Sequence, residues 1–242
     1  MLKVTESANS QVIRRAGERG FADHGWLRSY HSFSFADYYD PEHLQFGALR
    51  VINEDRIAPG TGFGTHSHRD MEIISYVLEG ELAHKDSMGH GSVIRPGDVQ
   101  RMSAGTGVQH SEFNNSKEVS THFLQIWIVP NQVGIEPGYE ERHFTAQEKQ
   151  GALRLIASSD GREGSVLVHQ DASIYALILN DDQTVEYALA NHRRAYAHVA
   201  RGTLTINGQR LDAGDALLAE KGLTLAMGNA QNAELLLFDL AL

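Results

Sequence analysis

Two histidines stand two residues apart in the stretch that decides the fold, Gly64-Thr65-His66-Ser67-His68-Arg69-Asp70-Met71-Glu72. A second stretch, Gly107-Val108-Gln109-His110-Ser111-Glu112, holds a histidine and a glutamate at the same spacing. Side chains two residues apart on a β-strand leave it on the same face. Two such strands can bring four donor groups to one point. The pattern predicts one metal site, with the ligands His66, His68, His110 and Glu112.

Three imidazoles and one carboxylate are a donor set typical of divalent transition metals. Fe, Ni, Mn, Cu and Zn all accept such nitrogen and oxygen ligands, whereas Ca²⁺ and Mg²⁺ prefer oxygen ligands alone. The residue types leave the choice among the transition metals open. We expect one ion per chain.

Glu72 competes with Glu112 for the place of the carboxylate ligand. It follows the His-x-His pair by four residues, a spacing that supplies the third ligand in many β-barrels with one metal. We favour Glu112, because it alternates with His110 along one strand. Glu72 is then expected to point inward and to accept a hydrogen bond from a ligand imidazole. His31 is a less favoured ligand than any of these.

Several other polar residues have ordinary roles in this interpretation. His84 and His90 lie between the two motifs and are expected at the surface or the rim of the site. The aromatic stretch from Phe21 to Phe35 is expected to line the core or the mouth of the site. Gln125 interrupts the apolar run 123–129, and it either faces the site or lies at an edge.

The two halves of the chain share a spacing of glycines that indicates an internal repeat. Val77–Leu82 resembles Val199–Leu204, and Pro96–Asp98 resembles Ala213–Asp215. In the first half, the four expected ligands lie at fixed numbers of residues from two of these glycines. The same steps in the second half lead to Ala188, Ala190, Met227 and Asn229. The spacing therefore predicts a duplicated domain in which only the first copy binds metal.

Short strand-like runs separated by turn residues fill both halves, which predicts an all-β protein. We expect two antiparallel β-barrel domains of jelly-roll type in one chain. Residues 1–135 would form the metal-binding domain, and residues 136–242 would form a domain without metal ligands. The polar, turn-rich stretch 131–150 would connect them. An alternative arrangement packs the first residues on the second domain.

The composition excludes several classes of function. The chain of 242 residues has no cysteine, which rules out disulfides and iron–sulfur clusters. Its net charge is −10 at pH 7, and it has no basic cluster that could follow a nucleic-acid backbone. No apolar run is long enough for a transmembrane helix, and the first residues lack the apolar core of a signal peptide. We expect a cytoplasmic monomer without membrane or direct nucleic-acid contacts.

The two metal motifs resemble those of the cupin superfamily and, within it, of the pirin family. The first cupin motif, G(X)5HXH(X)3,4E(X)6G, is matched at Gly60, His66, His68 and Glu72, with Gly80 one residue late. The second, G(X)5PXG(X)2H(X)3N, is matched at Gly97, Gly105, His110 and Asn114, with Ser103 in place of proline and two extra residues before the histidine. These departures are similar to pirins, as are the stretches Met71–Gly80 and Met102–Gly107.

The resemblance implies a bicupin whose second domain holds no metal. It places the metal ligands at His66, His68, His110 and Glu112. Fe(II) is then the expected metal, with Ni, Cu, Mn or Zn as alternatives. Several bacterial pirins are quercetin 2,3-dioxygenases, so the resemblance implies a flavonol such as quercetin and O₂ as substrates. Glu112 would take the proton of the substrate's 3-hydroxyl group.

Two other hypotheses stay open. Some pirins are described as metal-dependent regulators that bind protein partners, and the same ligands would serve such a non-catalytic, iron-dependent protein. A purely structural metal is less favoured, because structural sites are usually closed and rich in cysteine. A pocket of flavonol size beside the metal would favour the dioxygenase. We expect its walls to include Phe33, Phe63 and Trp127, and the residues that bind substrate are otherwise not predicted.

Overall fold

The structure is a computed structural model that describes residues 11–242. Its regular elements are β-strands, apart from the four-residue helix α1 (Ala146–Lys149) and two 3₁₀-helices, η1 (Ala16–Glu18) and η2 (Arg162–Gly164). The predicted all-β class is confirmed. Within residues 11–242, no helix has the length and apolar character needed to cross a membrane. The prediction about a signal peptide falls on the first residues, which lie outside the described range.

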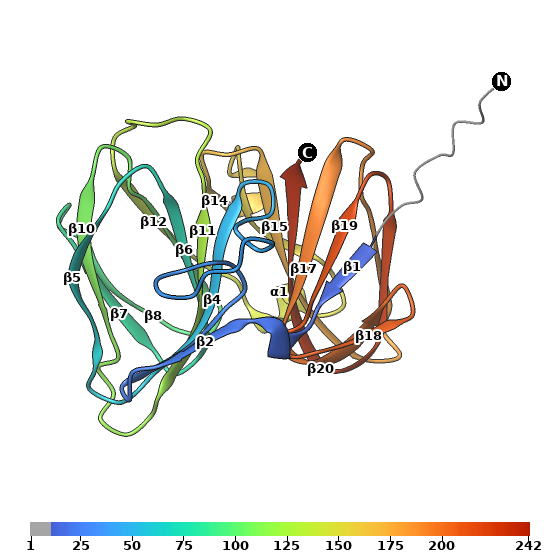
Figure 1. Cartoon of the computed structure of the whole chain (residues 1–242), viewed down its shortest axis with the longest axis horizontal. Coiled ribbons are helices and arrows are strands. Elements are labelled where there is room, and N and C mark those ends of the chain that lie inside the picture. Colours follow the sequence, from blue (N-terminus) through green and yellow to red (C-terminus); the bar gives the residue numbers. More distant parts are fainter. Residues whose placement is uncertain (1–10) are drawn as a thin grey trace. The chain divides into compact units, whose positions relative to one another are not determined.

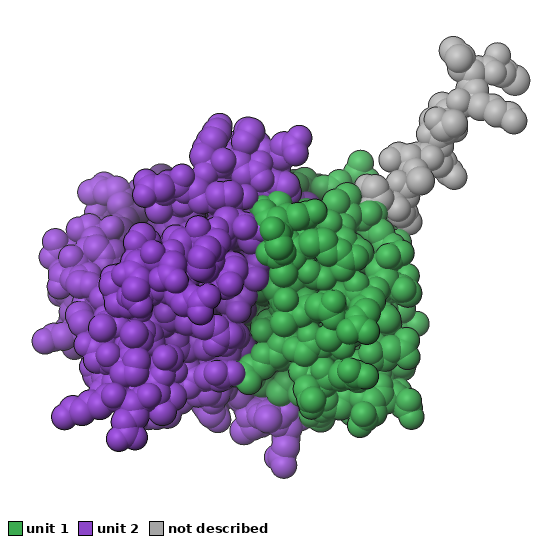
Figure 2. Space-filling model, turned by 60° about the horizontal axis from the view of Figure 1, so that its bottom comes forward, with its two compact units in different colours: residues 1–18, 149–154, 174–242 green, residues 19–148, 155–173 purple. Residues whose placement is uncertain are grey.

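The chain divides into two compact units, shown in different colours in Figure 2. Unit 2 consists of Arg19–Glu148 and Leu155–Ser173. Among the described residues, unit 1 holds 11–18, Lys149–Arg154 and Ile174–Leu242. The domain division after residue 135, which the turn-rich stretch suggested, stays a prediction.

Unit 2 contains two antiparallel sheets (Figure 1). The smaller sheet has the order β5-β10-β7-β8, and the larger has the order β12-β9-β6-β11-β4-β3-β2. The strands of the smaller sheet are β5 (Gly62–His68), β7 (Leu82–Asp86), β8 (Gly91–Ile94) and β10 (Val108–Phe113). Those of the larger are β2 (Gly20–Asp23), β3 (Leu27–His31), β4 (Leu49–Ile57), β6 (Glu72–Glu79), β9 (Asp98–Ser103), β11 (Thr121–Ile128) and β12 (Gly138–His143). Two short strands, β13 (Arg154–Ser158) and β14 (Val166–Leu167), pair in parallel.

Apolar side chains from both sheets meet in the core of unit 2. Leu82 and Ile94 come from the smaller sheet, and they cluster with Val77 and Phe123 of the larger sheet. All four are almost completely buried, which stabilises the unit by roughly 1.5–3 kcal/mol for each side chain. The two sheets therefore pack face to face, as in a β-sandwich.

The sheets are open and do not form the closed barrels that we expected. Each hydrogen-bonded order has two ends, β5 and β8 in the smaller sheet and β12 and β2 in the larger. An alternating sequence determines which face of a strand is buried, but not whether two edge strands bond to each other. The barrel prediction is corrected on this point, while the antiparallel pairing is confirmed.

Unit 1 is built on one sheet whose order includes β1-β19-β17-β20-β15, with β18 paired to β17 and β16 paired to β20. Its strands are β1 (Gln11–Arg14), β15 (Ala172–Asp181), β16 (Val185–Ala188), β17 (Arg193–Ile206), β18 (Gln209–Asp212), β19 (Ala216–Glu220) and β20 (Thr224–Ala241). Leucine, valine and alanine side chains fill its core. β1 extends this sheet by pairing with β19.

The strand pairings of the two units correspond, as the repeat predicts. β5 pairs with β10 in unit 2, and β16 pairs with β20 in unit 1. The register differs, however, because His66 lies opposite His110, whereas Met227 lies opposite Val185 and not Ala188. Met227 is buried in the apolar core of unit 1. Among residues 11–242, the side-chain groups that could hold a metal all lie in unit 2.

Gly105 occupies a position that alanine cannot share. Its φ is +44°, and an added Cβ would lie 2.1 Å from the carbonyl oxygen of Ile135. We expect Gly105→Ala to lower the free energy of unfolding by roughly 1–3 kcal/mol, the usual cost of a strained backbone position. Urea denaturation would measure it. Gly17→Ala is the control, since nothing lies within 4 Å of its Cβ position, and equal losses in both variants would contradict the argument.

Candidate metal centre

Strands β5 and β10 bring three histidines together. His66 lies directly opposite His110 in the antiparallel register, and His68 lies opposite Val108. The ring centroids of His66 and His110 are 4.4 Å apart, and that of His68 is 4.8 Å from each of them. The Nε2 atoms of His68 and His110 are 3.0 Å apart. Three of the four predicted ligands therefore converge as expected from their spacing.

The three imidazoles are suited to bind a cation through nitrogen lone pairs. Burial, and secondarily the neighbouring His66, lowers the pKa of His68 to about 4, and the same causes lower the pKa of His110 further. Both rings are therefore neutral at pH 7. His66 Nδ1 donates a hydrogen bond to the carbonyl oxygen of Gly64 at 2.8 Å, which leaves its Nε2 as the lone-pair atom. The donor set fits a divalent transition metal.

Glu112 lies beside this cluster with its carboxylate completely buried. Its Oε1 accepts a hydrogen bond from Ser75 Oγ at 3.1 Å, and its Oε2 accepts one from Gln125 Nε2 at 3.0 Å. Burial raises the pKa of Glu112 to about 7 against the effect of these two bonds. One carboxylate oxygen of Glu112 belongs to a cluster with donor atoms of His110 and His84. It does not belong to the cluster that contains His66 and His68. The place of Glu112 as fourth ligand stays a prediction.

Glu72 forms its hydrogen bonds away from the cluster of His66, His68 and His110, contrary to our expectation. Its buried carboxylate accepts hydrogen bonds from Ser103 Oγ at 3.0 Å and from the backbone nitrogen of His169 at 3.3 Å. Ser75, on the same strand β6, contacts Glu112. Side chains alternate along a strand, so Glu72 points to the opposite face of the sheet. The prediction that Glu72 supports a ligand imidazole is corrected accordingly.

His84 lies inside this region and not at the surface or the rim, contrary to our expectation. It lies on β7 directly opposite Glu112 on β10, and it is buried, not at the rim. Donor atoms of His84, His110 and Glu112 lie within 4.8 Å of one another. The available signal was the spacing of His84 and Asp86, which repeats the two-residue step of the ligand pairs.

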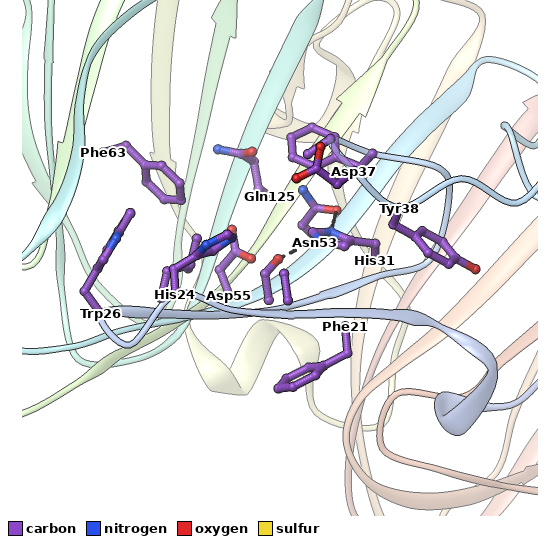
Figure 3. A pocket seen from close by; sticks show the side chains of 15 residues that line it. Phe21, His24, Trp26, His31, Asp37, Tyr38, Asn53, Asp55, Phe63 and Gln125 are labelled. Carbon is purple, nitrogen blue, oxygen red and sulfur yellow. Dashed lines mark hydrogen bonds between the residues drawn. The ribbon is translucent and has the colours of Figure 1, made fainter.

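A cavity of about 560 Å³ lies within unit 2 (Figure 3). Aromatic side chains form much of its wall, and Figure 3 shows Trp26 and Phe63 toward one end and Tyr38 toward the other. Asn53 and Asp55 contribute polar groups. The volume falls in the range of small-molecule sites, and the mixture of aromatic walls and few polar groups is typical of them.

The cavity adjoins the histidine cluster without being lined by its three rings. Gln125 lines the cavity and donates a hydrogen bond to Glu112, so it faces the site, one of the two roles left open for it. Phe63 also lines the cavity, and its ring centroid is 6.3 Å from that of His66. These two side chains connect the aromatic cavity with the candidate ligands.

The other expected wall residues lie elsewhere. Trp127 packs edge-on against His68, with 5.1 Å between ring centroids. Phe33 is buried in the protein interior. His31 lines the cavity, and its Nδ1 bonds to Asn53 Oδ1 at 2.8 Å. Of the three predicted wall residues, only Phe63 lines the cavity.

Both halves of the chain match models of known protein families. The family model described as Pirin matches residues 12–128, and the model described as Quercetinase C-terminal cupin domain matches residues 155–240. The second match confirms the expected bicupin organisation.

Individual relatives match over nearly the whole chain. A protein of Escherichia coli K12 named quercetin 2,3-dioxygenase is 48% identical over 228 residues, which cover 94% of this chain and 97% of that protein. A pirin-like protein of Caulobacter vibrioides is 41% identical over 223 residues, with 92% and 96% covered. The crystal structure of the Escherichia coli pirin YhhW in complex with nickel(II) matches with a TM-score of 0.91 and 46% identity, and covers 96% of this chain and 99% of that one. With these matches along both halves, the chain belongs to the pirin family.

Proposed function

We propose that the protein is a metal-dependent dioxygenase that cleaves a flavonol such as quercetin at the histidine centre. The observation that carries the proposal is the aromatic cavity of about 560 Å³, which Gln125 connects to Glu112. The relative of Escherichia coli K12 named quercetin 2,3-dioxygenase supports the same substrate class. Fe(II) is the metal we favour. The nickel(II) complex of YhhW makes nickel an alternative.

His66, His68, His110 and Glu112 would hold the metal. When bound there, it would acidify a coordinated substrate hydroxyl group and bring the substrate and O₂ together. Ser75 and Gln125 each occupy one oxygen of Glu112 with a hydrogen bond, and they thereby orient the carboxylate. Each carboxylate oxygen keeps further lone-pair capacity. Glu112 can therefore accept the proton of the substrate's 3-hydroxyl group.

The cavity would hold the flat ring system of the substrate. Trp26 and Phe63 pack edge to face, with ring centroids 5.2 Å apart, and they form a rigid aromatic wall. Asn53 and Asp55 offer hydrogen-bonding groups to ring hydroxyls at the same cavity. Aromatic walls keep water from the reacting carbons while the polar groups set the orientation. We further expect a cytoplasmic monomer that contacts neither membrane nor nucleic acid directly.

Oxygen uptake on quercetin tests the proposal. The purified protein is loaded with Fe(II), Ni(II), Cu(II) or Mn(II), and oxygen consumption and carbon monoxide release are recorded. We expect metal-dependent turnover that falls at least about a hundredfold in Glu112→Ala, the lower end of the usual loss of a general base. His66→Ala should lose turnover together with the metal.

The competing hypothesis is a non-catalytic regulator whose metal controls the binding of a protein partner. It would use the same histidines, so metal binding alone does not separate the two. Stoichiometric metal without oxygen uptake on quercetin would overturn the dioxygenase proposal and favour the regulator.

A further inference from the structure

A small space next to His110 collects buried polar groups that have no hydrogen-bond partners. It is lined by Ile73, Ser75, His84, Gln100, Met102, His110 and Glu112, and it has no room for a water molecule. The Nδ1 atoms of His84 and His110 are both buried and have no hydrogen-bond partner within residues 11–242. A buried polar group without a hydrogen bond lowers the stability of the folded protein, so such groups usually have a partner.

Asp86 determines which nitrogen of His84 carries the proton. The Asp86 Oδ2 atom lies 3.1 Å from His84 Nε2, and its Oδ1 accepts the backbone N–H groups of Met88 and His90 at 2.9 and 3.0 Å. An ionised carboxylate can only accept, so His84 Nε2 is the donor. The Nδ1 atom of His84 is therefore left with a lone pair. Tyr139 holds the ring in place, with 5.1 Å between centroids.

His110 has the complementary arrangement. Its Nε2 faces His68 Nε2 at 3.0 Å and is the nitrogen directed at the candidate metal position. A metal-bound Nε2 leaves the proton on Nδ1. His110 thus has a buried donor without an acceptor, while His84 has a buried acceptor without a donor. The two ring centroids are 5.4 Å apart.

We propose that His84 is a positioning residue of the metal centre, whose Nδ1 accepts a hydrogen bond from the Nδ1–H group of His110. Asp86, His84 and His110 then form one chain of hydrogen bonds that keeps Nε2 of His110 free for the metal. Partners of this kind orient metal-bound imidazoles and strengthen their binding. The inference rests on the ligand role of His110, and it holds whether the protein is a dioxygenase or a regulator.

Cobalt(II) affinity in chain variants tests the inference without measuring turnover. Binding is followed by the visible absorption of the bound ion in competition with a chelator. Asp86→Asn preserves the shape of the side chain, but its amide donates to His84 Nε2 and places a proton on Nδ1, opposite the donor of His110. We expect Asp86→Asn and His84→Leu to weaken binding by about 10–100-fold, the usual cost of losing such a partner.

Three further variants separate this role from a purely structural one. His84→Asn places an acceptor near the former Nδ1 position and should restore affinity to within about threefold of wild type. His90→Ala also loses a contact with Asp86, but His90 does not line the small space beside His110, and the variant should bind cobalt(II) normally. Gln100→Met replaces another polar side chain that lines the small space and should have no effect. Urea unfolding of the metal-free proteins shows whether any variant has lost its fold.

Nitrogen-15 NMR of the zinc-loaded wild-type protein provides an independent measurement. It should show the proton on Nε2 in His84 and on Nδ1 in His110. The opposite tautomer of His84 would overturn the inference, as would wild-type affinity in Asp86→Asn. Equal losses in His84→Asn and His84→Leu would assign His84 a packing role only. The absence of oxygen uptake would affect the dioxygenase proposal alone, whereas failure of the wild type to bind cobalt(II) would remove the metal centre itself.

Discussion

Replacing His110 by alanine is expected to lower the affinity for a divalent metal by at least about a hundredfold. The loss of a mere partner of a ligand typically costs 10–100-fold, and His110 supplies a donor atom itself. Its ring lies 4.4 Å from that of His66, and its Nε2 is 3.0 Å from that of His68. No other histidine on β10 could take its place, because its neighbours along the strand are Gln109 and Ser111.

Isothermal titration with Ni(II) and with Zn(II) measures this loss. Metal at a hundred times its dissociation constant stabilises a folded protein by about 2.7 kcal/mol, so the metal-dependent rise in melting temperature should also disappear in His110→Ala. His192→Ala is the matched control, because His192 is exposed in unit 1. Unchanged stoichiometry and affinity in His110→Ala would show that the three-histidine cluster is not the metal site.

The convergence of the three histidines could be predicted because it depends on a local rule. Residues two apart on a strand share a face, so His66 and His68 necessarily point the same way. The pairing of β5 with β10 then places His110 against them. The glycine spacing added the information that the second half repeats the strand order without the ligands. The local pattern does not show which strand pairs with β5, so this pairing had to be inferred separately.

The face of Glu72 could not be predicted, because the alternation is interrupted between the histidines and β6. Asp70 has a φ of +48°, and this turn separates β5 from β6. Counting in steps of two from His68 to Glu72 assumes a continuous strand. The turn interrupts the alternation of side-chain directions, which begins anew in β6. Ser75 therefore faces the candidate metal centre, and Glu72 faces away from it.

The burial of His84 could not be predicted for a different reason. Its burial depends on residues distant in the chain, among them Tyr139 on β12 of the larger sheet, whose ring centroid is 5.1 Å from that of His84. A local pattern does not reveal such a neighbour. The three-residue difference in register between the two units could not be predicted either, because a count of residues along the chain does not fix how two strands pair.

Replacing Asp55 by asparagine is expected to stabilise the protein at alkaline pH and to flatten its pH dependence. Asp55 lies on β4 at the aromatic cavity, and its Oδ1 atom is buried without a hydrogen-bond partner among residues 11–242. Burial raises its pKa from 3.8 to about 7, and the charges of Glu112 and Glu54 add to the rise while a bond from Ser29 opposes it. The folded protein therefore keeps Asp55 protonated where the unfolded chain has already released the proton.

The sign of the effect follows from this difference in proton binding. The stability that Asp55 contributes is complete below pH 3.8 and is lost as the pH rises toward 7, because the folded state must then bury a charge. The shift corresponds to up to about 4 kcal/mol above pH 7. An asparagine side chain at this position would carry no charge, so the Asp55→Asn variant should exceed wild type by up to about 4 kcal/mol at pH 8.5 and show no advantage near pH 4. Urea unfolding of the metal-free proteins across this range measures the difference, with the exposed Asp182→Asn as the control. A constant difference between Asp55→Asn and wild type at all pH values would instead mean that Asp55 is already ionised in the folded protein, and that its free oxygen acts in the cavity as a charged acceptor.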